Sequence, residues 1–295
     1  MRTRFAPAPT GFLHLGHIAN ALFVWGEARV RGAEVLLRIE DHDRQRSRPE
    51  YERAILDDLD WLGLVPDLGG TAEFRAGASP YRQSDSHDAY HAAVVDLQRR
   101  GHQVYACDCS RRDLAERGGD EPDRETPYSG RCRDRGLAPA PGRGVRVAFA
   151  PGPESFTDLR LGPQTQDPAG QCGDLLLRDR LGNWTYQFAV AIDDLRHEVD
   201  LVIRGEDLLP STGRQLRLAR MLGRDLPPRF LHHPLIRKPN GEKLSKANRD
   251  TSVQDLKAAG VDREEIFGMA LHGISLLPEP TPRSLDEAMQ VVADH

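Results

Sequence analysis

The spacing of apolar positions near the N-terminus predicts a helix that begins directly after a turn-rich stretch. The stretch APAPTG contains two prolines and a glycine, which interrupt regular structure. Apolar residues then recur at intervals of three and four, as on one face of a helix: Leu15, Ile18, Ala19, Leu22 and Trp25. Gly32 is the predicted C-cap, and the following run EVLLRIED predicts a buried strand with acidic residues at its end.

A second helix is predicted over SRPEYERAILDDLDWLGL. Ser47 and Glu50 have the spacing of a capping box, and Pro49 fits the first turn of a helix. One helical face is apolar: Tyr51, Ile55, Leu59 and Leu62. The first part of the chain therefore alternates strand, helix, strand and helix, which is typical of a parallel α/β unit.

The middle of the chain has a different character and is interpreted as an insertion. From about residue 105 to residue 174 the sequence is rich in Gly, Pro and Arg and contains all four cysteines. The next segment, LLLRDRLGNWTYQFAVAIDDLRHEVDLVIRGED, again predicts strand, helix and strand, and STGRQLRLARMLG predicts an amphipathic helix ending at Gly223. A hairpin-like Asn-Gly turn then leads into a short helical tail.

These patterns predict an α/β fold with a Rossmann-type parallel sheet, split by an inserted subdomain and followed by a short helical C-terminal region. We expect the first half of the nucleotide-binding domain at residues 1–104 and the insertion at residues 105–174. The second half of the nucleotide-binding domain is expected at residues 175–238, and a loop with the helical tail at residues 239–295.

Composition and charge narrow the function classes. The chain has 295 residues, 39% of them hydrophobic, and a formal net charge of −5, whereas a non-specific nucleic-acid binder is usually basic. The N-terminal residues lack the apolar core of a signal peptide, and no apolar run approaches membrane-spanning length. Four cysteines do not indicate a disulfide framework. We therefore expect a cytoplasmic protein that does not interact with a membrane.

Two short stretches carry candidate phosphate chemistry. In PAPTGFLHLGH, Gly16 allows close approach of a phosphate where the first strand meets the first helix, and His14 and His17 can donate to it. In EKLSKAN, Lys243 and Lys246 flank Ser245 on a Gly-flanked loop. Taken alone, the first stretch also fits an ordinary helix start and the second a solvated surface turn.

Together and in this order, the two stretches resemble the H-I-G-H and K-M-S-K-S elements of class I aminoacyl-tRNA synthetases. The motifs RFAPAPTGFLHLGH, LLRIEDHD, YQFAVAIDD, VIRGEDLL and KLSKAN look like the glutamyl-specific branch of that family. The resemblance implies ATP as substrate with Mg²⁺, and catalytic roles for His14, His17, Lys243 and Lys246. The residues it implies for ATP binding are His14, Gly16, His17, Leu244, Ser245 and Lys246.

The resemblance extends to the glutamyl-queuosine tRNA(Asp) synthetase family, because the chain stops at His295, before the helical anticodon-binding domain of a full glutamyl-tRNA synthetase. That family activates L-glutamate without tRNA and transfers it to the queuosine base of tRNA(Asp). We expect a monomer with these partners. Three alternatives stay open: a glutamyl-tRNA synthetase charging an ordinary acceptor end, a ligase for another amino acid or acceptor, and a non-catalytic tRNA-binding paralogue.

A glutamate pocket needs guanidinium groups for two carboxylates and an acid for the ammonium group. Arg4 and Arg204 lie at predicted strand ends, Glu40 ends LLRIE, and Tyr186 can add a hydroxyl contact. The positions that the resemblance implies for glutamate binding are Arg4, Ala6, Ala8, Glu40, Tyr186 and Arg204. Relatives generally read A-P-S-P where this chain reads APAP, so Ala8 replaces a serine expected to bind the amino acid.

The cysteines provide a candidate metal site. Cys107 and Cys109 form a C-x-C pair, and YSGRC follows with Tyr128 and Cys132. Three thiolates and a fourth donor can bind zinc tetrahedrally, although the spacing alone fits free cysteines equally well. The related family binds zinc with this arrangement, so the resemblance implies a structural zinc in the insertion. Cys172 falls outside the pattern and is interpreted as a structural or free thiol.

Overall fold

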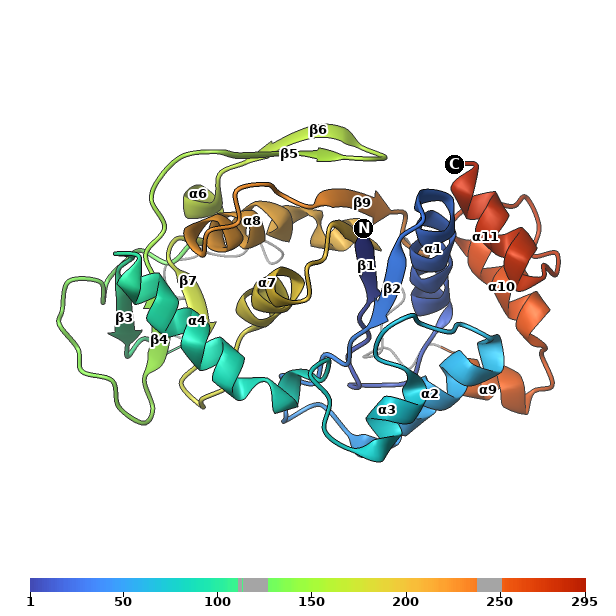
Figure 1. The fold of residues 1–295 in the computed structure, drawn as a ribbon, viewed down its shortest axis with the longest axis horizontal. Coiled ribbons are helices and arrows are strands. Elements are labelled where there is room, and N and C mark those ends of the chain that lie inside the picture. The colour runs from blue at the N-terminus through green and yellow to red at the C-terminus, as the bar shows by residue number, and fades with distance from the viewer. Residues whose placement is uncertain (111–112, 114–126, 238–250) are drawn as a thin grey trace. The chain divides into compact units, whose positions relative to one another are not determined.

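The computed structural model describes residues 1–110, 113, 127–237 and 251–295, and the chain forms two compact units (Figure 1). The first unit combines residues 1–85, 199–209 and 228–295. The second combines residues 86–198 and 210–227. Each unit has its own hydrophobic core.

The first unit contains two pairs of parallel strands. Strand β1 (Arg2–Phe5) pairs with β2 (Glu34–Leu37), and β8 (Leu201–Gly205) pairs with β9 (Arg229–His233). The two pairs lie side by side, because the Asp200 N–H donates to the Arg2 carbonyl oxygen over 2.9 Å. This arrangement confirms the predicted parallel α/β organisation, in which the carboxyl ends of the strands share one edge.

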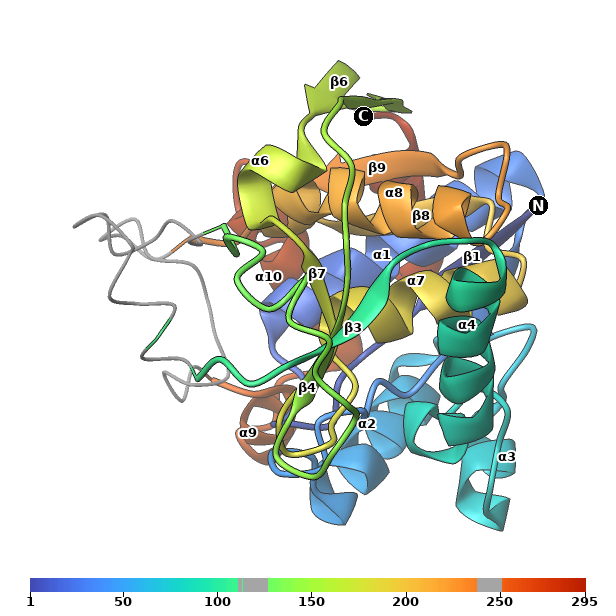
Figure 2. The same ribbon diagram turned by 90° about the vertical axis from the view of Figure 1, so that its left-hand side faces the viewer.

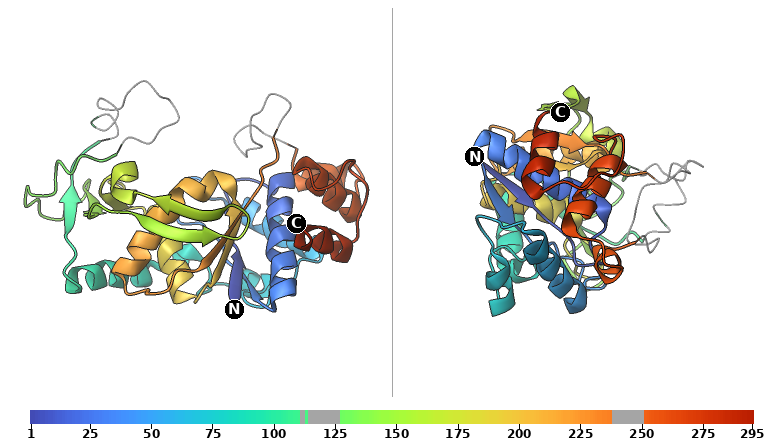
Figure 3. Two further views of the ribbon diagram at one scale, coloured as in Figure 1. Left: turned by 90° about the horizontal axis from the view of Figure 1, so that it is seen from above. Right: turned by 90° about the vertical axis from the view of Figure 1, so that its right-hand side faces the viewer.

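Helices cover this unit, and their bounds are α1 (Leu15–Arg31), α2 (Pro49–Leu62), α3 (Thr71–Ala76), α9 (Val253–Ala258), α10 (Arg263–Gly273), α11 (Leu285–Ala293) and the 3₁₀ helix η1 (Gln83–Asp85). Helix α1 and its C-cap are confirmed: Gly32 has φ 59° and its N–H donates to the Ala28 carbonyl oxygen. Figure 3 shows the C-terminal helices α10 and α11 beside α1. The predicted apolar face of α1 packs into the core of the first unit, where the centroid of the Trp25 ring lies 5.5 Å from that of Phe5 in β1.

The expected capping box at Ser47 is wrong. Helix α2 has Arg48 as its N-cap, with φ −133° and ψ 138°, and no side chain caps it. Pro49 occupies the first turn as predicted, and the ring of a proline pushes the preceding residue into the extended region. The helix therefore begins one residue later than the capping box requires, and the Ser47 hydroxyl is buried without a hydrogen-bond partner among the described residues.

The second unit contains a three-stranded antiparallel sheet and an antiparallel pair of strands. Strands β3 (Val104–Cys107), β4 (Gly144–Val147) and β7 (Leu175–Arg178) form one sheet, and β5 (Glu154–Asp158) pairs with β6 (Gly162–Gln166) (Figure 2). The helices of this unit are α4 (His87–Arg99), α6 (Pro168–Cys172), α7 (Tyr186–Arg196) and α8 (Thr212–Met221). A further 3₁₀ helix, η2 (Glu206–Ser211), follows β8.

The predicted order of strand, helix and strand over residues 175–205 is confirmed by β7, α7 and β8. The predicted amphipathic helix is α8, which ends two residues before Gly223. The core of this unit is aromatic and aliphatic, with Tyr90, Trp184 and Phe188 in mutual ring contact. Over the residues that the structure describes, every helix is too short or too polar to cross a lipid bilayer.

Candidate functional site

Two histidines cap the start of α1. His14 is the N-cap residue, and its Nδ1 accepts the Gly16 N–H over 3.1 Å. The Nδ1 of His17 accepts the His14 N–H, also over 3.1 Å. Because both Nδ1 atoms act as acceptors, the ring proton of each neutral imidazole lies on Nε2. Both rings can therefore donate from Nε2 at a helix N-terminus, where a phosphate is also favoured by the helix dipole.

Gly16 is required by the close approach of the His14 ring. A Cβ at position 16 would lie 3.0 Å from His14 Cε1 and 3.1 Å from Nδ1. The ring would have to shift by a few tenths of an ångström to relieve such a contact. The glycine in the stretch HLGH thus has a local structural reason: it leaves room for the histidine two residues earlier.

Arg4 and Arg204 lie on neighbouring strands at the carboxyl edge of the sheet. Arg4 Nη1 donates to the Ile203 carbonyl oxygen over 3.1 Å, which ties the end of β1 to β8. Arg204 Nε donates to His232 Nε2 over 3.1 Å, and each arginine is only 4% exposed. The structure therefore brings these two predicted carboxylate-binding residues together as buried cations.

Glu40, predicted to take the substrate ammonium, is held by a residue that sequence reasoning missed. Arg38 Nη2 donates to Glu40 Oε1 over 2.8 Å, and both side chains are almost completely buried. Such a partner offsets the loss of hydration of a buried carboxylate. The sequence feature that could have indicated this partner is Arg38 itself, a charged residue between Leu37 and Ile39 in an apolar run.

Ala6 and Ala8 lie in the turn after β1, and backbone hydrogen bonds connect this turn to the segment carrying Glu40. The Glu40 N–H donates to the Pro7 carbonyl oxygen over 3.1 Å, and the Arg38 N–H donates to the Phe5 carbonyl oxygen over 3.0 Å. Both alanines are partly exposed. The turn and the glutamate carboxylate are thus fixed relative to each other through the main chain.

The predicted loop residues Lys243, Leu244, Ser245 and Lys246 lie outside the described residues. The described chain resumes at residue 251, close to the histidines: Ser252 forms a β-bridge with His14, and the Val253 N–H donates to the Leu13 carbonyl oxygen over 2.8 Å. Ser252 caps α9, since its hydroxyl oxygen accepts the Asp255 N–H over 3.1 Å. The chain that follows the lysine stretch is thereby attached to the start of α1.

Tyr186 belongs to the second unit, where it is the first residue of α7 and half-buried. The residue before it, Thr185, is the N-cap of α7. The remaining residues predicted to bind glutamate, Arg4, Ala6, Ala8, Glu40 and Arg204, all belong to the first unit.

The predicted zinc ligands form a compact cluster in the second unit. The sulfur atoms of Cys107, Cys109 and Cys132 lie within 4.8 Å of one another, and those of Cys109 and Cys132 are 3.5 Å apart. The Tyr128 hydroxyl lies 3.5 Å from the Cys107 sulfur and 3.9 Å from the Cys109 sulfur. Three thiols and a phenol at these separations can surround one tetrahedral zinc ion, whose bonds to sulfur are about 2.3 Å long. The donor set fits zinc.

A second layer of side chains fixes this cluster. The buried Asp174 carboxylate accepts two hydrogen bonds from Arg133, at 2.6 Å and 2.9 Å, and one from Tyr105. Arg133 follows Cys132 directly, so the Arg133–Asp174 pair holds the cysteine in place. The Arg146 guanidinium lies 3.8 Å from the centre of the Tyr128 ring. Sequence spacing did not indicate Asp174 as a partner, because it lies far along the chain from the three cysteines of the cluster.

The three thiols do not share one electrostatic environment. Burial and the hydrogen bond with Cys132 together raise the pKa of Cys109 to about 11. Burial also opposes ionisation of Cys107, but hydrogen bonding from Tyr128 and the Arg146 guanidinium outweigh it and lower the pKa of that thiol. Of these two thiols, Cys107 is therefore the one that ionises first. Cys172 is not part of the cluster. Its thiol donates to the Pro168 carbonyl oxygen over 3.2 Å.

Comparisons with known proteins agree with this geometry. The family model of tRNA synthetases class I (E and Q), catalytic domain, matches residues 1–279. The chain is 38% identical to a glutamyl-Q tRNA(Asp) synthetase of Nitratidesulfovibrio vulgaris, covering 96% of this chain and 89% of the relative. It is 41% identical to glutamate–tRNA ligase 2 of Syntrophus aciditrophicus, covering 93% of this chain and 58% of that relative.

A solved glutamate–tRNA synthetase from Elizabethkingia anophelis superposes with a TM-score of 0.78 at 28% identity. The match covers 98% of this chain and 65% of the solved one. The fold is thus the α/β fold of these enzymes, with a parallel sheet and covering helices. The chain belongs to the class I aminoacyl-tRNA synthetases, in the glutamate and glutamine (E and Q) branch of these ligases.

Proposed function

We propose that this enzyme activates L-glutamate with ATP, without tRNA, and transfers the glutamyl group to the queuosine base of tRNA(Asp). The observation that carries the proposal is the pair of buried arginines, Arg4 and Arg204, beside the Arg38-supported carboxylate of Glu40. Two guanidinium groups match the two carboxylates of glutamate, and one carboxylate matches its ammonium group. The name of the Nitratidesulfovibrio relative supports the acceptor.

In the first step, the α-carboxylate of glutamate attacks the α-phosphate of ATP and pyrophosphate leaves. His14 and His17 donate from Nε2 to the phosphate oxygens, where negative charge develops. We expect Lys243 and Lys246 to contact the same phosphates, and Mg²⁺ to accompany ATP. Tyr186 adds a hydroxyl contact to the substrate.

In the second step, a queuosine hydroxyl attacks the carbonyl carbon of glutamyl-adenylate. The new ester bond forms as the bond between carbonyl carbon and phosphate oxygen breaks, AMP leaves with its electron pair, and the hydroxyl proton passes to solvent. A zinc ion held by Cys107, Cys109, Tyr128 and Cys132 would act structurally, by joining the end of β3 to the segment around Cys132.

A second candidate is a glutamate–tRNA ligase that charges an ordinary acceptor end. The 41% identity to the Syntrophus relative with that name favours it. Both candidate functions begin with the activation of glutamate by ATP. They differ in the RNA group that receives the glutamate. The acceptor must therefore be tested separately from activation.

ATP–pyrophosphate exchange across the twenty amino acids, without tRNA, tests the first step. Exchange with glutamate alone supports tRNA-independent activation, and exchange with another amino acid overturns the proposed substrate. Transfer of labelled glutamate is then compared among queuosine-containing tRNA(Asp), its unmodified transcript and tRNA(Glu). Labelling of the modified tRNA(Asp) alone supports the proposal, whereas labelling of tRNA(Glu) supports the second candidate.

A further inference from the structure

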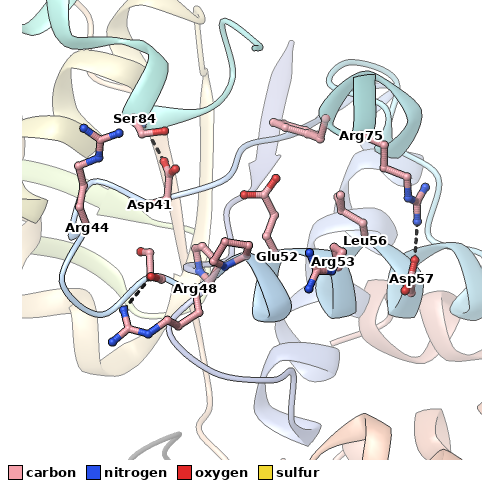
Figure 4. A pocket seen from close by; sticks show the side chains of 13 residues that line it. Asp41, Arg44, Arg48, Glu52, Arg53, Leu56, Asp57, Arg75 and Ser84 are labelled. Atoms are coloured by element: carbon pink, nitrogen blue, oxygen red, sulfur yellow. Dashed lines mark hydrogen bonds and ion pairs between the residues drawn. The ribbon is translucent and has the colours of Figure 1, made fainter. Parts of the chain in front are cut away.

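The first unit contains a cavity of about 540 Å³ whose residues have no role in the two steps above. We call it the Asp41 cavity. Its walls come from the loop that follows β2, from the start of α2 and from the neighbourhood of α3 (Figure 4). The lining includes Pro9, Asp41, Arg44, Pro49, Glu52 and Arg53. Its volume lies within the range of small-molecule sites.

The Asp41 cavity adjoins the proposed glutamate site. Asp41 directly follows Glu40, and the Arg48 N–H donates to the Pro9 carbonyl oxygen over 3.0 Å. Because Glu40 is bonded to the same turn through Pro7, one hydrogen-bonded backbone unit carries both the ammonium-binding carboxylate and the cavity wall. The wall of the cavity and the carboxylate proposed to bind the ammonium group therefore belong to one backbone segment.

Asp41 supplies an acceptor in the wall of the cavity. The Ser84 N–H donates to Asp41 Oδ1 over 2.7 Å, and the two labelled side chains face each other in Figure 4. Burial raises the pKa of Asp41, although the hydrogen bonds from Ser84 and the charge of Arg82 lower it. The neighbouring Glu52 is already paired, since Arg82 Nη2 lies 2.6 Å from its Oε1.

Arginines at the rim supply cations that the described residues leave unpaired. Arg44 and Arg53 are exposed, and neither makes a hydrogen bond or ion pair within the described part of the chain. By contrast, Arg75 is neutralised by Asp57 and Asp60, at 2.8 Å each. Unpaired surface arginines are common, but here two of them border a cavity that also presents an acceptor and apolar surface.

A nucleotide within an RNA strand matches this combination. Its phosphates are anions for the rim arginines, its base offers N–H donors to a carboxylate, and its ring faces can lie against apolar side chains. The queuosine base adds a secondary amine that is cationic at neutral pH, a suitable partner for the Asp41 carboxylate, which accepts a hydrogen bond from Ser84. Pro9 and Pro49 provide apolar walls.

We propose that the Asp41 cavity binds the acceptor nucleotide of the tRNA, with its base amine on Asp41 and the adjacent phosphates on Arg44 and Arg53. This inference rests on the proposed function, because it places the receiving nucleotide next to glutamyl-adenylate. It assigns the recognition of the acceptor to the loop that follows β2.

The test uses the full chain and the variants Arg44→Ala, Arg53→Ala and Asp41→Asn. Arg263→Ala is the matched control, because Arg263 is an exposed arginine of the same unit that does not line the cavity. Three quantities are measured for each: glutamate-dependent exchange without tRNA, the Kd of tRNA(Asp) as a function of salt, and single-turnover transfer of glutamate to queuosine-containing tRNA(Asp).

The two arginine variants are expected to weaken tRNA binding, and each should reduce the slope of log Kd against log salt by about 0.7, as expected for one lost phosphate contact to a single strand. Asp41→Asn should reduce the preference for queuosine-containing tRNA over its unmodified transcript by about 10-fold, the loss of one charge-assisted hydrogen bond. Exchange should stay within about twofold, because these contacts concern the acceptor only.

Unchanged tRNA affinity and transfer in all three variants would overturn the inference, as would equal losses in Arg263→Ala or a parallel loss of exchange. Failure of the proposed function looks different. In that case the wild-type enzyme shows no glutamate-dependent exchange or no transfer, while Arg44→Ala and Arg53→Ala still weaken tRNA binding. That result would support the cavity as an RNA-binding site and contradict the proposed reaction.

Discussion

The imidazole rings of His14 and His17 lie with their centroids 3.9 Å apart at the start of α1, and each accepts a backbone N–H at Nδ1. The motif therefore does two things at once. It satisfies donors that a helix start otherwise leaves without partners, and it fixes the direction in which both Nε2–H groups point. In the proposed mechanism, the geometry of the two phosphate-binding histidines therefore depends on helix capping.

Replacing Gly16 by alanine should separate activity from stability. The new Cβ would lie 3.0 Å from His14 Cε1, so the ring must move by a few tenths of an ångström. A displacement of about 1 Å can cost on the order of 100-fold in rate, so a smaller loss of activity is expected here. Alanine favours a helix by up to about 1 kcal/mol over glycine, so the melting temperature should not fall. Glutamate-dependent exchange and thermal unfolding measure the two effects. Gly70→Ala is the control, because a Cβ there meets nothing within 4 Å. A variant that loses stability and activity together would contradict this explanation.

Replacing Arg204 by lysine should weaken glutamate binding specifically. Lysine keeps the charge but lacks the planar group that forms paired hydrogen bonds with a carboxylate and donates to His232. Loss of a hydrogen bond to a charged group costs about 1.5–3 kcal/mol, which corresponds to a rise of about 10- to 150-fold in the KM for glutamate. The KM for ATP should change little. Arg229→Lys, at the exposed start of β9, is the matched control. An equal rise in both KM values would argue against a carboxylate-binding role.

Replacing Ala8 by serine tests what the alanine does to the pocket. A hydroxyl at this position should contribute one hydrogen bond to the amino acid, about 1 kcal/mol, and lower the KM for glutamate about fivefold. Exchange kinetics with glutamate and glutamine measure the effect. If the variant gains activity with another amino acid and none with glutamate, the pocket is not built for glutamate.

Replacing Cys109 by serine should remove zinc. The cluster would keep two thiols and the Tyr128 hydroxyl, and serine oxygen is a poor zinc ligand at neutral pH. Zinc content, measured by atomic emission, should fall well below one ion per chain, and the melting temperature should fall with it. Cys172→Ser should retain the metal, because Cys172 donates to the Pro168 carbonyl oxygen and is not part of the cluster. Full zinc occupancy in Cys109→Ser would refute the ligand assignment.

Asp58 should make stability depend on pH. Its fully buried carboxylate lies 3.2 Å from Lys257 Nζ and 2.6 Å from Gln254 Nε2, and burial raises its pKa above the ordinary value of 3.8. Between 3.8 and this raised pKa the folded chain binds more protons than the unfolded chain, so the free energy of unfolding falls as pH rises through that interval. Asp58→Asn should show a flatter profile there in urea unfolding followed by circular dichroism. Parallel profiles for the two proteins would show that another group is responsible.

The elements that the sequence predicted well depend on local chemistry. Helix α1 follows from apolar periodicity and a C-terminal glycine, and the parallel strands follow from their alternation with helices. Arg4, Glu40 and Arg204 could be placed at one edge because parallel strands end together. The family resemblance then supplied their chemistry.

The features that the sequence could not predict are contacts between side chains distant in sequence or dependent on rotamers. The capping role of both Nδ1 atoms depends on the orientation of the two rings, and the Asp174 support of the cysteine cluster comes from a strand end far along the chain. The capping box predicted at Ser47 does not form, because Pro49 forces Arg48 into the extended region and makes it the N-cap instead. Arg38 was visible only as an unexplained charge in an apolar run.

The hydrogen bond between Val253 and Leu13 has a consequence for how the molecule is made. On the ribosome, the histidine-bearing turn emerges among the first residues, yet the segment that it pairs with is synthesised near the end. The core of the first unit likewise joins residues such as Ile18 to Phe267 and Val292. The proposed nucleotide-binding site is therefore assembled only after residue 253 has been synthesised, whereas the second unit is complete by residue 227. A nascent chain released before residue 253 would contain the two histidines but not the segment that pairs with them, and we expect it to be inactive.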